Sequence, residues 1–277
     1  MPVPIDWQAK VEARDRRCQF ARRRTAGGRD LRQPERRDHR PAPGQPLDHG
    51  DYYGIAIDDR IVLTSRFSGA VPGGGSDPGP VLRNAVNPST RGVDLVATWG
   101  AGIGAGALTL SAAANLTGTS VDEINIPEIT AAFREANGRA SGDAEREVIR
   151  NTLFNREERN RFEDALPRTK IGLSARYDLG SLSLLTGATW YGPVEYKPAN
   201  TDHDETFDGR TIIDLDVGRD LLPGVRLAVG ANNLLNTFPE EHEKQANIGS
   251  RGFVYSRRVP RFGVNGGFYY GRLSLDL

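Results

Sequence analysis

An acidic stretch in the last third of the sequence has residue types that could bind a metal ion. The segment "TDHDETFD" (201–208) contains four consecutive potential ligands: Asp202, His203, Asp204 and Glu205. Carboxylates and imidazole together suit a hard or borderline cation. A second stretch, "EEHEK" (240–244), places His242 among acidic residues. Neither spacing fixes a coordination geometry, so a solvated acidic loop is the favoured alternative for both.

A glycine-rich segment offers a different chemistry. "GAGIGAG" (100–106) matches the G-x-G-x-x-A pattern of dinucleotide folds, and Asp122 follows about twenty residues later, as such folds require. A phosphate would need a helix N-terminus after the glycines. The residues that follow instead alternate with a period of two and include several threonines. We therefore interpret this segment as a hairpin turn.

The sequence contains no other pattern typical of a catalytic site. It has only four histidines, and no spacing of Ser, His and Asp indicates an activated nucleophile. The single cysteine, Cys18, rules out an intramolecular disulfide and a zinc site built on cysteine pairs. We predict that the protein is not an enzyme and requires no cofactor.

Composition narrows the class of protein. The formal net charge of +0 argues against a protein that coats nucleic acid, and we expect no nucleic-acid partner. Hydrophobic residues make up 38% of the chain, and no apolar run reaches the roughly 18 residues that a membrane-spanning helix needs. This excludes helical membrane proteins but not β-barrels, whose strands alternate and dilute the hydropathy signal.

The segment 1–49 differs from the rest of the chain. It is rich in Arg and Pro and has no apolar period, so we predict that it is disordered. Only four of the 36 Lys and Arg residues in the chain are Lys, which suggests GC-rich coding DNA. A frameshift or a mis-assigned start would explain the segment, while a basic nucleic-acid-binding arm would need aromatic residues that are nearly absent.

From residue 50 onward the sequence predicts β-strands. In "TKIGLSARYDL", Ile171, Leu173 and Ala175 alternate with Lys170 and Ser174, which places them on opposite faces of a strand. Each such segment has about ten residues, enough for a tilted strand to cross a bilayer. Eight segments show this alternation: 51–67 (through Tyr53, Ile55 and Ile57), 91–99, 107–118, 169–179, 181–191, 210–221, 224–236 and 261–277.

The connections between these segments are sorted by length. Short ones (100–106, 179–181 and 220–224) are rich in Gly and Pro, whereas the alternate ones span roughly 68–90, 118–168, 192–208 and 237–262. Outer-membrane barrels have short periplasmic turns and long outer loops. Five aromatic residues near predicted strand ends fit the aromatic girdle of such a barrel: Trp99, Trp190, Tyr191, Phe268 and Tyr269. We predict an all-β, antiparallel fold with about eight strands.

The longest connection is predicted to be partly helical. A loop of this length rarely lacks structure of its own. Within residues 141–167, Val148, Ile149 and Leu153 would share one face of a helix. Asn155 with Glu158 resembles a capping box.

Several segments resemble the TonB-dependent receptors of Gram-negative outer membranes. "NNLLNTFPE" (232–240) is similar to their penultimate-strand signature, and "FGVNGGFYYGRLSLDL" resembles their terminal strand. "DYYGIAIDDRIVL" and "RGVDLVATW" are similar to recurring barrel segments. The resemblance covers 50–277 and implies the C-terminal part of a barrel that in this family has about 22 strands.

The resemblance also implies partners and a function. The family takes up scarce nutrients, namely ferric siderophores, cobalamin-like complexes or oligosaccharides, so the small-molecule ligand remains open. The expected partners are membrane lipid, the barrel assembly machinery that reads the C-terminal strand, and the inner-membrane energy transducer TonB. From this resemblance we expect the chain to lack the family's plug domain and TonB docking box, and Leu277 stands where the family usually has an aromatic residue. The alternative is a non-transporting remnant, a pseudogene product or an adhesive barrel fragment.

Overall fold

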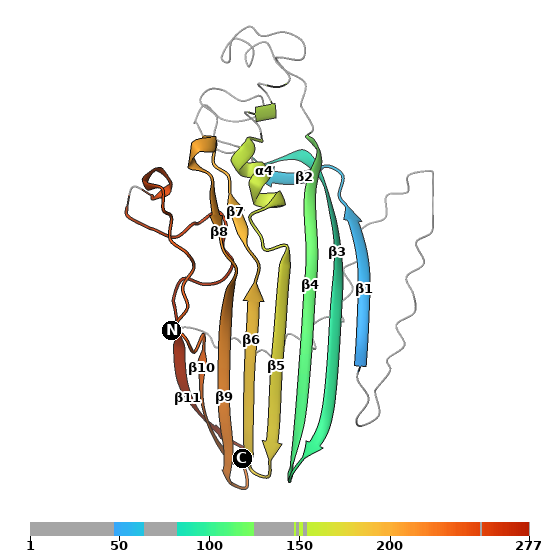
Figure 1. Cartoon of the computed structure of the whole chain (residues 1–277), viewed down its shortest axis with the longest axis vertical. Coiled ribbons are helices and arrows are strands. Elements are labelled where there is room, and N and C mark those ends of the chain that lie inside the picture. Colours follow the sequence, from blue (N-terminus) through green and yellow to red (C-terminus); the bar gives the residue numbers. More distant parts are fainter. Residues whose placement is uncertain are drawn as a thin grey trace. The chain divides into compact units, whose positions relative to one another are not determined.

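The structure is a computed structural model that describes residues 47–63, 82–124, 147, 150, 151, 154–249 and 251–276. All of these residues belong to one compact unit, Arg40–Leu277. Most of them form one antiparallel sheet with the order β1-β3-β4-β5-β6-β9-β10-β11 (Figure 1). Its strands are β1 (Leu47–Ala56), β3 (Leu82–Ile103), β4 (Gly106–Ile124), β5 (Thr169–Leu179), β6 (Leu182–Tyr191), β9 (Arg210–Leu222), β10 (Val225–Asn232) and β11 (Phe268–Leu275).

The sheet is antiparallel, as predicted, and its strands form a meander. In this order each strand pairs with the one that precedes it and the one that follows it, while β2 (Arg60–Leu63) also pairs with β3. Strands β1 and β11 are the two ends of the order, and within the described residues they do not pair with each other. The sheet is therefore open along both edges in the described part of the chain.

Short and long connections lie at opposite ends of the sheet. Gly104 and Ala105 join β3 to β4, Gly180 and Ser181 join β5 to β6, and Pro223 and Gly224 join β9 to β10. The three glycines have φ of 62°, 57° and 76°, a conformation that favours Gly because it has no Cβ. These turns lie at the bottom of Figure 1, and the described parts of the long connections lie above, with α4, β2, β7 and β8. The glycine-rich segment is thus a hairpin, although Gly100 and Gly102 belong to β3 and not to the turn.

The first predicted strand differs from the observed one. Residues 51–67 were expected to form one strand, but β1 ends at Ala56 and β2 begins at Arg60. Asp59, between them, has φ of 54°, which a continuous strand cannot contain. Of the predicted disordered segment, 1–46 lie outside the described residues, and Leu47–His49 are the start of β1.

Register gives the sheet two chemically different faces. The row Ala97, Ala112, Leu173, Ala188 and Ile213 crosses five strands, and we call the side that it occupies the apolar face. The adjacent row points to the other side, the polar face, and consists of Thr98, Ser111, Ser174, Gly187 and Asp214. The prediction that Leu173 and Ser174 lie on opposite faces is confirmed.

The predicted aromatic girdle is divided between the two faces. Trp99, Trp190 and Tyr269 lie on the apolar face, in register with Leu110, Ile171 and Ala231 respectively. Tyr191 and Phe268 lie on the polar face, where the ammonium of Lys170 sits 5.0 Å from the centre of the Tyr191 ring. Only the first three can therefore form a girdle on the apolar side.

The apolar residues of the sheet are largely exposed. Leu173, Leu273 and Tyr269 keep 55%, 60% and 62% of their surface accessible. The buried clusters lie instead at the end with the long connections. One contains Val62, Val86, Val121 and Phe154, and the other contains Ala165, Val194, Phe207 and Val259. In the described residues the sheet is thus a single layer with its apolar face open.

Tyr53 of β1 lies over Gly92 of β3 on the polar face, and this contact generates a prediction. A Cβ added at Gly92 would overlap the Tyr53 hydroxyl and lie 2.8 Å from the carbonyl oxygen of Leu116. Gly92→Ala should therefore lower the free energy of unfolding by about 1–3 kcal/mol. Gly54, on the same strand pair, has nothing within 4 Å of its added Cβ. Urea titrations of the two variants should show a loss for Gly92→Ala alone, and equal values would contradict the close approach.

Candidate functional site: an ion-pair clamp among the long connections

Helix α4 (Arg156–Glu163) is the central element of the long connections. It consists mostly of Arg and Glu, which are good helix formers. The side chain of Asn155 accepts a 2.9 Å hydrogen bond from the backbone N–H of Glu158, which confirms Asn155 as the N-cap of the predicted capping box. The predicted helical face of Val148, Ile149 and Leu153 lies outside the described residues. No helix in the described part of the chain is long and apolar enough to cross a membrane.

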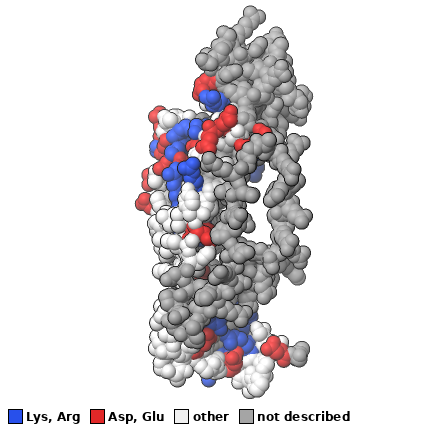
Figure 2. Space-filling view, turned by 90° about the vertical axis from the view of Figure 1, so that its right-hand side faces the viewer, with Lys and Arg blue, Asp and Glu red and all other residues white. Residues whose placement is uncertain are grey.

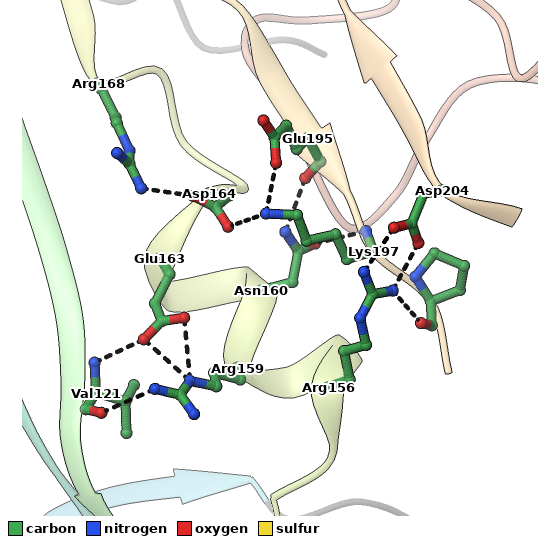
Figure 3. A network of polar contacts seen from close by, with 11 residues as sticks. Val121, Arg156, Arg159, Asn160, Glu163, Asp164, Arg168, Glu195, Lys197 and Asp204 are labelled. Atoms are coloured by element: carbon green, nitrogen blue, oxygen red, sulfur yellow. Dashed lines mark hydrogen bonds and ion pairs between the residues drawn. The ribbon is translucent and has the colours of Figure 1, made fainter. Parts of the chain in front are cut away.

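Helix α4 is anchored to the end of β4. Phe162 packs against the cluster around Val121, and the guanidinium of Arg60 lies 4.8 Å from the centre of the Phe162 ring. Glu163 accepts a hydrogen bond of 2.9 Å from the backbone N–H of Val121, while Arg159 donates to the carbonyl of Val121 and also pairs with Glu163 at 3.0 Å (Figure 3). Apolar packing and a closed set of polar contacts therefore hold the helix to the sheet.

Helix α4 also binds a small hairpin, β7 (Val194–Tyr196) with β8 (Glu205–Phe207), that the sequence did not predict. The buried side chain of Asn160 donates to the carbonyl of Glu195 at 2.9 Å and accepts from the backbone N–H of Lys197 at 3.1 Å. The Lys197 ammonium pairs with Asp164 at 2.6 Å, and Arg168 pairs with the same carboxylate (Figure 3). Asn160 thus satisfies two backbone groups on the edge of the hairpin.

A bidentate ion pair joins the connection that carries α4 to the connection that carries the hairpin. Both terminal nitrogens of Arg156 donate to Asp204 at 2.6 Å, and one also donates to the carbonyl of Pro198 at 2.8 Å (Figure 3). The hydrogen bonds from Arg156 hold the pKa of Asp204 below its usual value, and the same bonds raise the pKa of Arg156. Asp204 is therefore charged across the whole neutral range.

A third connection reaches α4 through Arg258. Its guanidinium pairs with Glu157 at 3.1 Å and with the buried Glu158 at 3.0 Å, and Glu158 also pairs with Arg161 at 2.7 Å. The hydroxyl of Tyr196 donates to Glu157 at 3.2 Å. Burial, and next the charge of Glu157, raise the pKa of Tyr196 to about 12. The tyrosine therefore remains a neutral hydrogen-bond donor.

Glu205 forms the second link to the third connection. It meets His242 Nδ1 at 2.5 Å, both side chains are buried, and the His242 ring packs against the rings of Tyr196 and Phe207. Burial raises the pKa of Glu205, but hydrogen bonds from the Lys244 backbone N–H, His242 and Asn247 outweigh it and leave the pKa below its usual value. We call this whole set of contacts the loop clamp. It comprises the contacts of α4 with β4 and with the hairpin, the ion pairs of Arg258 with α4, and the pair of His242 with Glu205.

The loop clamp contains two of the four predicted metal ligands. Asp202 and His203 lie on the short 3-10 helix η2 (Thr201–His203), away from the ion pairs, whereas the carboxylates of Asp204 and Glu205 are bonded to Arg156 and His242. In the part of the chain that the structure describes, no three His, Cys, Asp or Glu side chains are grouped so as to hold a metal ion. The metal site stays a prediction.

The clamp can hold three connections together, and sequence reasoning did not find most of its residues. No local sequence pattern marks Arg156, Asn160 and Arg258 as clamp residues, because their partners lie 35 to 100 positions away in the sequence. In Figure 2, Lys and Arg atoms lie next to Asp and Glu atoms toward the top of the view. The arrangement fixes loop positions and can present them to a ligand.

A comparison with protein families matches residues 49–234 to the model described as TonB dependent receptor-like, beta-barrel. No curated protein matches the sequence. Among solved structures, the chain is similar to the outer membrane transporter YddB from Escherichia coli, with a TM-score of 0.50, 11% identity, and coverage of 83% of this chain and 30% of that one. At this identity the likeness shows the fold alone.

Two further solved structures share the same region. The FrpB iron transporter from Neisseria meningitidis has a TM-score of 0.49 and 14% identity, with 83% of this chain and 29% of that chain covered. The copper transporter OprC has a TM-score of 0.48 and 15% identity, with 83% and 28% covered. The chain therefore spans less than a third of the length of these proteins.

The bidentate pair predicts a pH-dependent clamp. Because the folded-state pKa of Asp204 is lowered, the pair adds stability above the ordinary carboxyl pKa of about 4, and this is lost as the pH falls through the lower folded value. Asp204→Asn should reduce the free energy of local opening of α4 by roughly 1 kcal/mol at pH 7, a small value because both side chains are about one-third exposed. Hydrogen exchange of the α4 amides measures this quantity.

The matched control for this variant is Asp202→Asn, two positions away and exposed outside the ion pairs. At pH 7 and at pH 3, this variant should show the same hydrogen-exchange protection of the α4 amides as the unmodified chain. Equal protection in the Asp204→Asn and Asp202→Asn variants at pH 7 would mean that the bidentate pair does not hold the helix.

Proposed function

Because this chain belongs to the TonB-dependent receptor family, we propose that it forms the C-terminal part of the barrel wall of an outer-membrane receptor that takes up a scarce nutrient. One observation carries the proposal: a single-layer antiparallel meander has an exposed apolar face on one side and a polar face on the other. Such a sheet suits a boundary between lipid and water. The residues contribute binding and gating, and no bond is made or broken.

The orientation in the outer membrane follows from the connections. The two-residue turns would lie in the periplasm, and the long connections with the loop clamp would lie outside the cell. The polar face would then line a wet lumen. Its side chains are paired with one another: Asn115 donates to Asp94 at 2.5 Å, Arg226 pairs with Asp220 at 2.8 Å, and Tyr270 donates to Asp216 at 2.7 Å. Water and these partners would satisfy the charged groups.

The loop clamp would act at the outer mouth of this receptor. By joining three outer connections, it would hold them as one unit around a small-molecule ligand, for which siderophore-iron, a cobalamin-like complex and an oligosaccharide remain the candidates. The family's further partners would be TonB, the energy transducer of the inner membrane, and the assembly machinery that reads the last strand, here β11. These assignments apply to a complete receptor, of which this chain spans only part.

Paired arginine substitutions on β5 test the membrane assignment. Leu173→Arg places a charge in the middle of the apolar face and should cost roughly 2–4 kcal/mol of stability in the membrane. Ser174→Arg places the same charge on the polar face and should cost far less. Urea titrations of the chain folded into phosphatidylcholine vesicles measure both. Equal losses would show that neither face contacts lipid, and the proposed function would then fail.

Only two of the four predicted metal ligands have side chains that remain available to a metal-bearing ligand. Since Arg156 and His242 occupy Asp204 and Glu205, a metal-bearing ligand could reach only Asp202 and His203 of the four. Asp202→Ala with His203→Ala should weaken binding of Cu²⁺ or Fe³⁺, titrated alone by calorimetry, by at least about tenfold. Glu241→Ala with Glu243→Ala removes two exposed acids nearby as a control. Unchanged affinity in the first variant would leave this stretch as a solvated acidic loop.

A further inference from the structure

One charged side chain interrupts the apolar face of β5, β6, β9, β10 and β11. Arg219 of β9 lies in register between Leu182 of β6 and Leu227 of β10, both on the apolar face. In these five strands it is the only charged residue on that face. Its side chain is exposed and forms no hydrogen bond or ion pair with another described residue. A cation at this position therefore has no partner in the described part of the chain.

The other arginines of these strands are different. Arg176, Arg210, Arg226 and Arg272 lie on the polar face, and their carboxylate partners are Asp178 at 2.7 Å, Glu240 at 2.8 Å, Asp220 at 2.8 Å and Asp216 at 3.4 Å. Their charges are thus compensated by carboxylates of the chain itself. Arg219 lacks a carboxylate partner in the sheet because it is the only charged residue on the apolar face of these five strands.

Leucines surround Arg219. Leu179, Leu182, Leu227 and Leu273 share its row across the sheet, with 38%, 39%, 43% and 60% of their surface exposed. The row lies next to the turn between β5 and β6. Asp220, which follows Arg219, donates its backbone N–H to the carbonyl of Ser181 in that turn at 2.9 Å. The side chain can therefore lay its methylene stem on leucine and reach the lower boundary of the apolar face with its charged end.

We propose that Arg219 binds the phosphate of an anionic phospholipid head group in the leaflet at the short-turn end. The inference rests on the proposed function, since it requires that the apolar face contacts lipid. An unpaired guanidinium left in hydrocarbon would be costly. A head-group phosphate offers two oxygens that match its forked donors, and it sits at the boundary that the side chain can reach. The phosphate would supply the counter-charge that the sheet lacks.

The test counts lipids that the full chain retains. The protein is folded in micelles that contain equal amounts of phosphatidylglycerol and phosphatidylcholine, and native mass spectrometry gives the ratio of the two lipids bound. We expect a preference for phosphatidylglycerol that falls about fivefold in Arg219→Leu, since one basic residue near a lipid surface contributes about 1 kcal/mol. Arg219→Lys should retain most of the preference because it keeps the charge.

Arg226→Leu is the matched control, because Arg226 lies on the neighbouring strand but on the polar face. It should leave the lipid ratio unchanged. Equal retention of the two lipids by the unmodified chain, or a preference that persists in Arg219→Leu, would overturn the inference. Failure of the proposed function has a different signature, since the unmodified chain would then not fold into phosphatidylcholine vesicles.

Discussion

The rest of the structure depends on one constraint: the apolar face of a single-layer sheet must be covered by something other than water. Leu173, Leu273 and Tyr269 are each more than half exposed, and the described residues provide no second layer over them. Leaving apolar surface in water costs about 25 cal/mol per Å². The opposite face carries paired charges, so the sheet cannot be buried on both sides. A lipid bilayer on one side and water on the other satisfies both faces.

The same constraint explains where the ion pairs and buried hydrogen bonds of the loop clamp lie. A meander with two-residue turns at one end must place its long connections at the other end, as Figure 1 shows. Among the described residues of these connections, two small apolar clusters, ion pairs and buried hydrogen bonds provide the links. Arg156 with Asp204 and Arg258 with Glu158 join the same three connections that the cluster of Ala165, Val194, Phe207 and Val259 packs together. The fold and the clamp are consequences of the same topology.

The sequence predicts some of these features well and others poorly, for physical reasons. The strands on both sides of Gly180 were predicted within one residue, because their alternation is uninterrupted and the turn needs a glycine. The break at Asp59 was missed, because a single left-handed residue leaves the alternation of its neighbours intact. Hairpin strands of three residues are too short to show a period. The clamp depends on contacts such as Arg258–Glu158, which local spacing cannot reveal.

The most direct test of the membrane-wall account is a lipid-quenching scan along β5. After Cys18→Ser, single cysteines at 170 to 176 are labelled with a fluorophore, and the chain is folded into vesicles whose acyl chains carry a quencher. The account predicts quenching with a period of two, strong at 171, 173 and 175 and weak at 170, 172, 174 and 176, because only the first set faces lipid. Uniform quenching, or quenching at none of these positions, would contradict it.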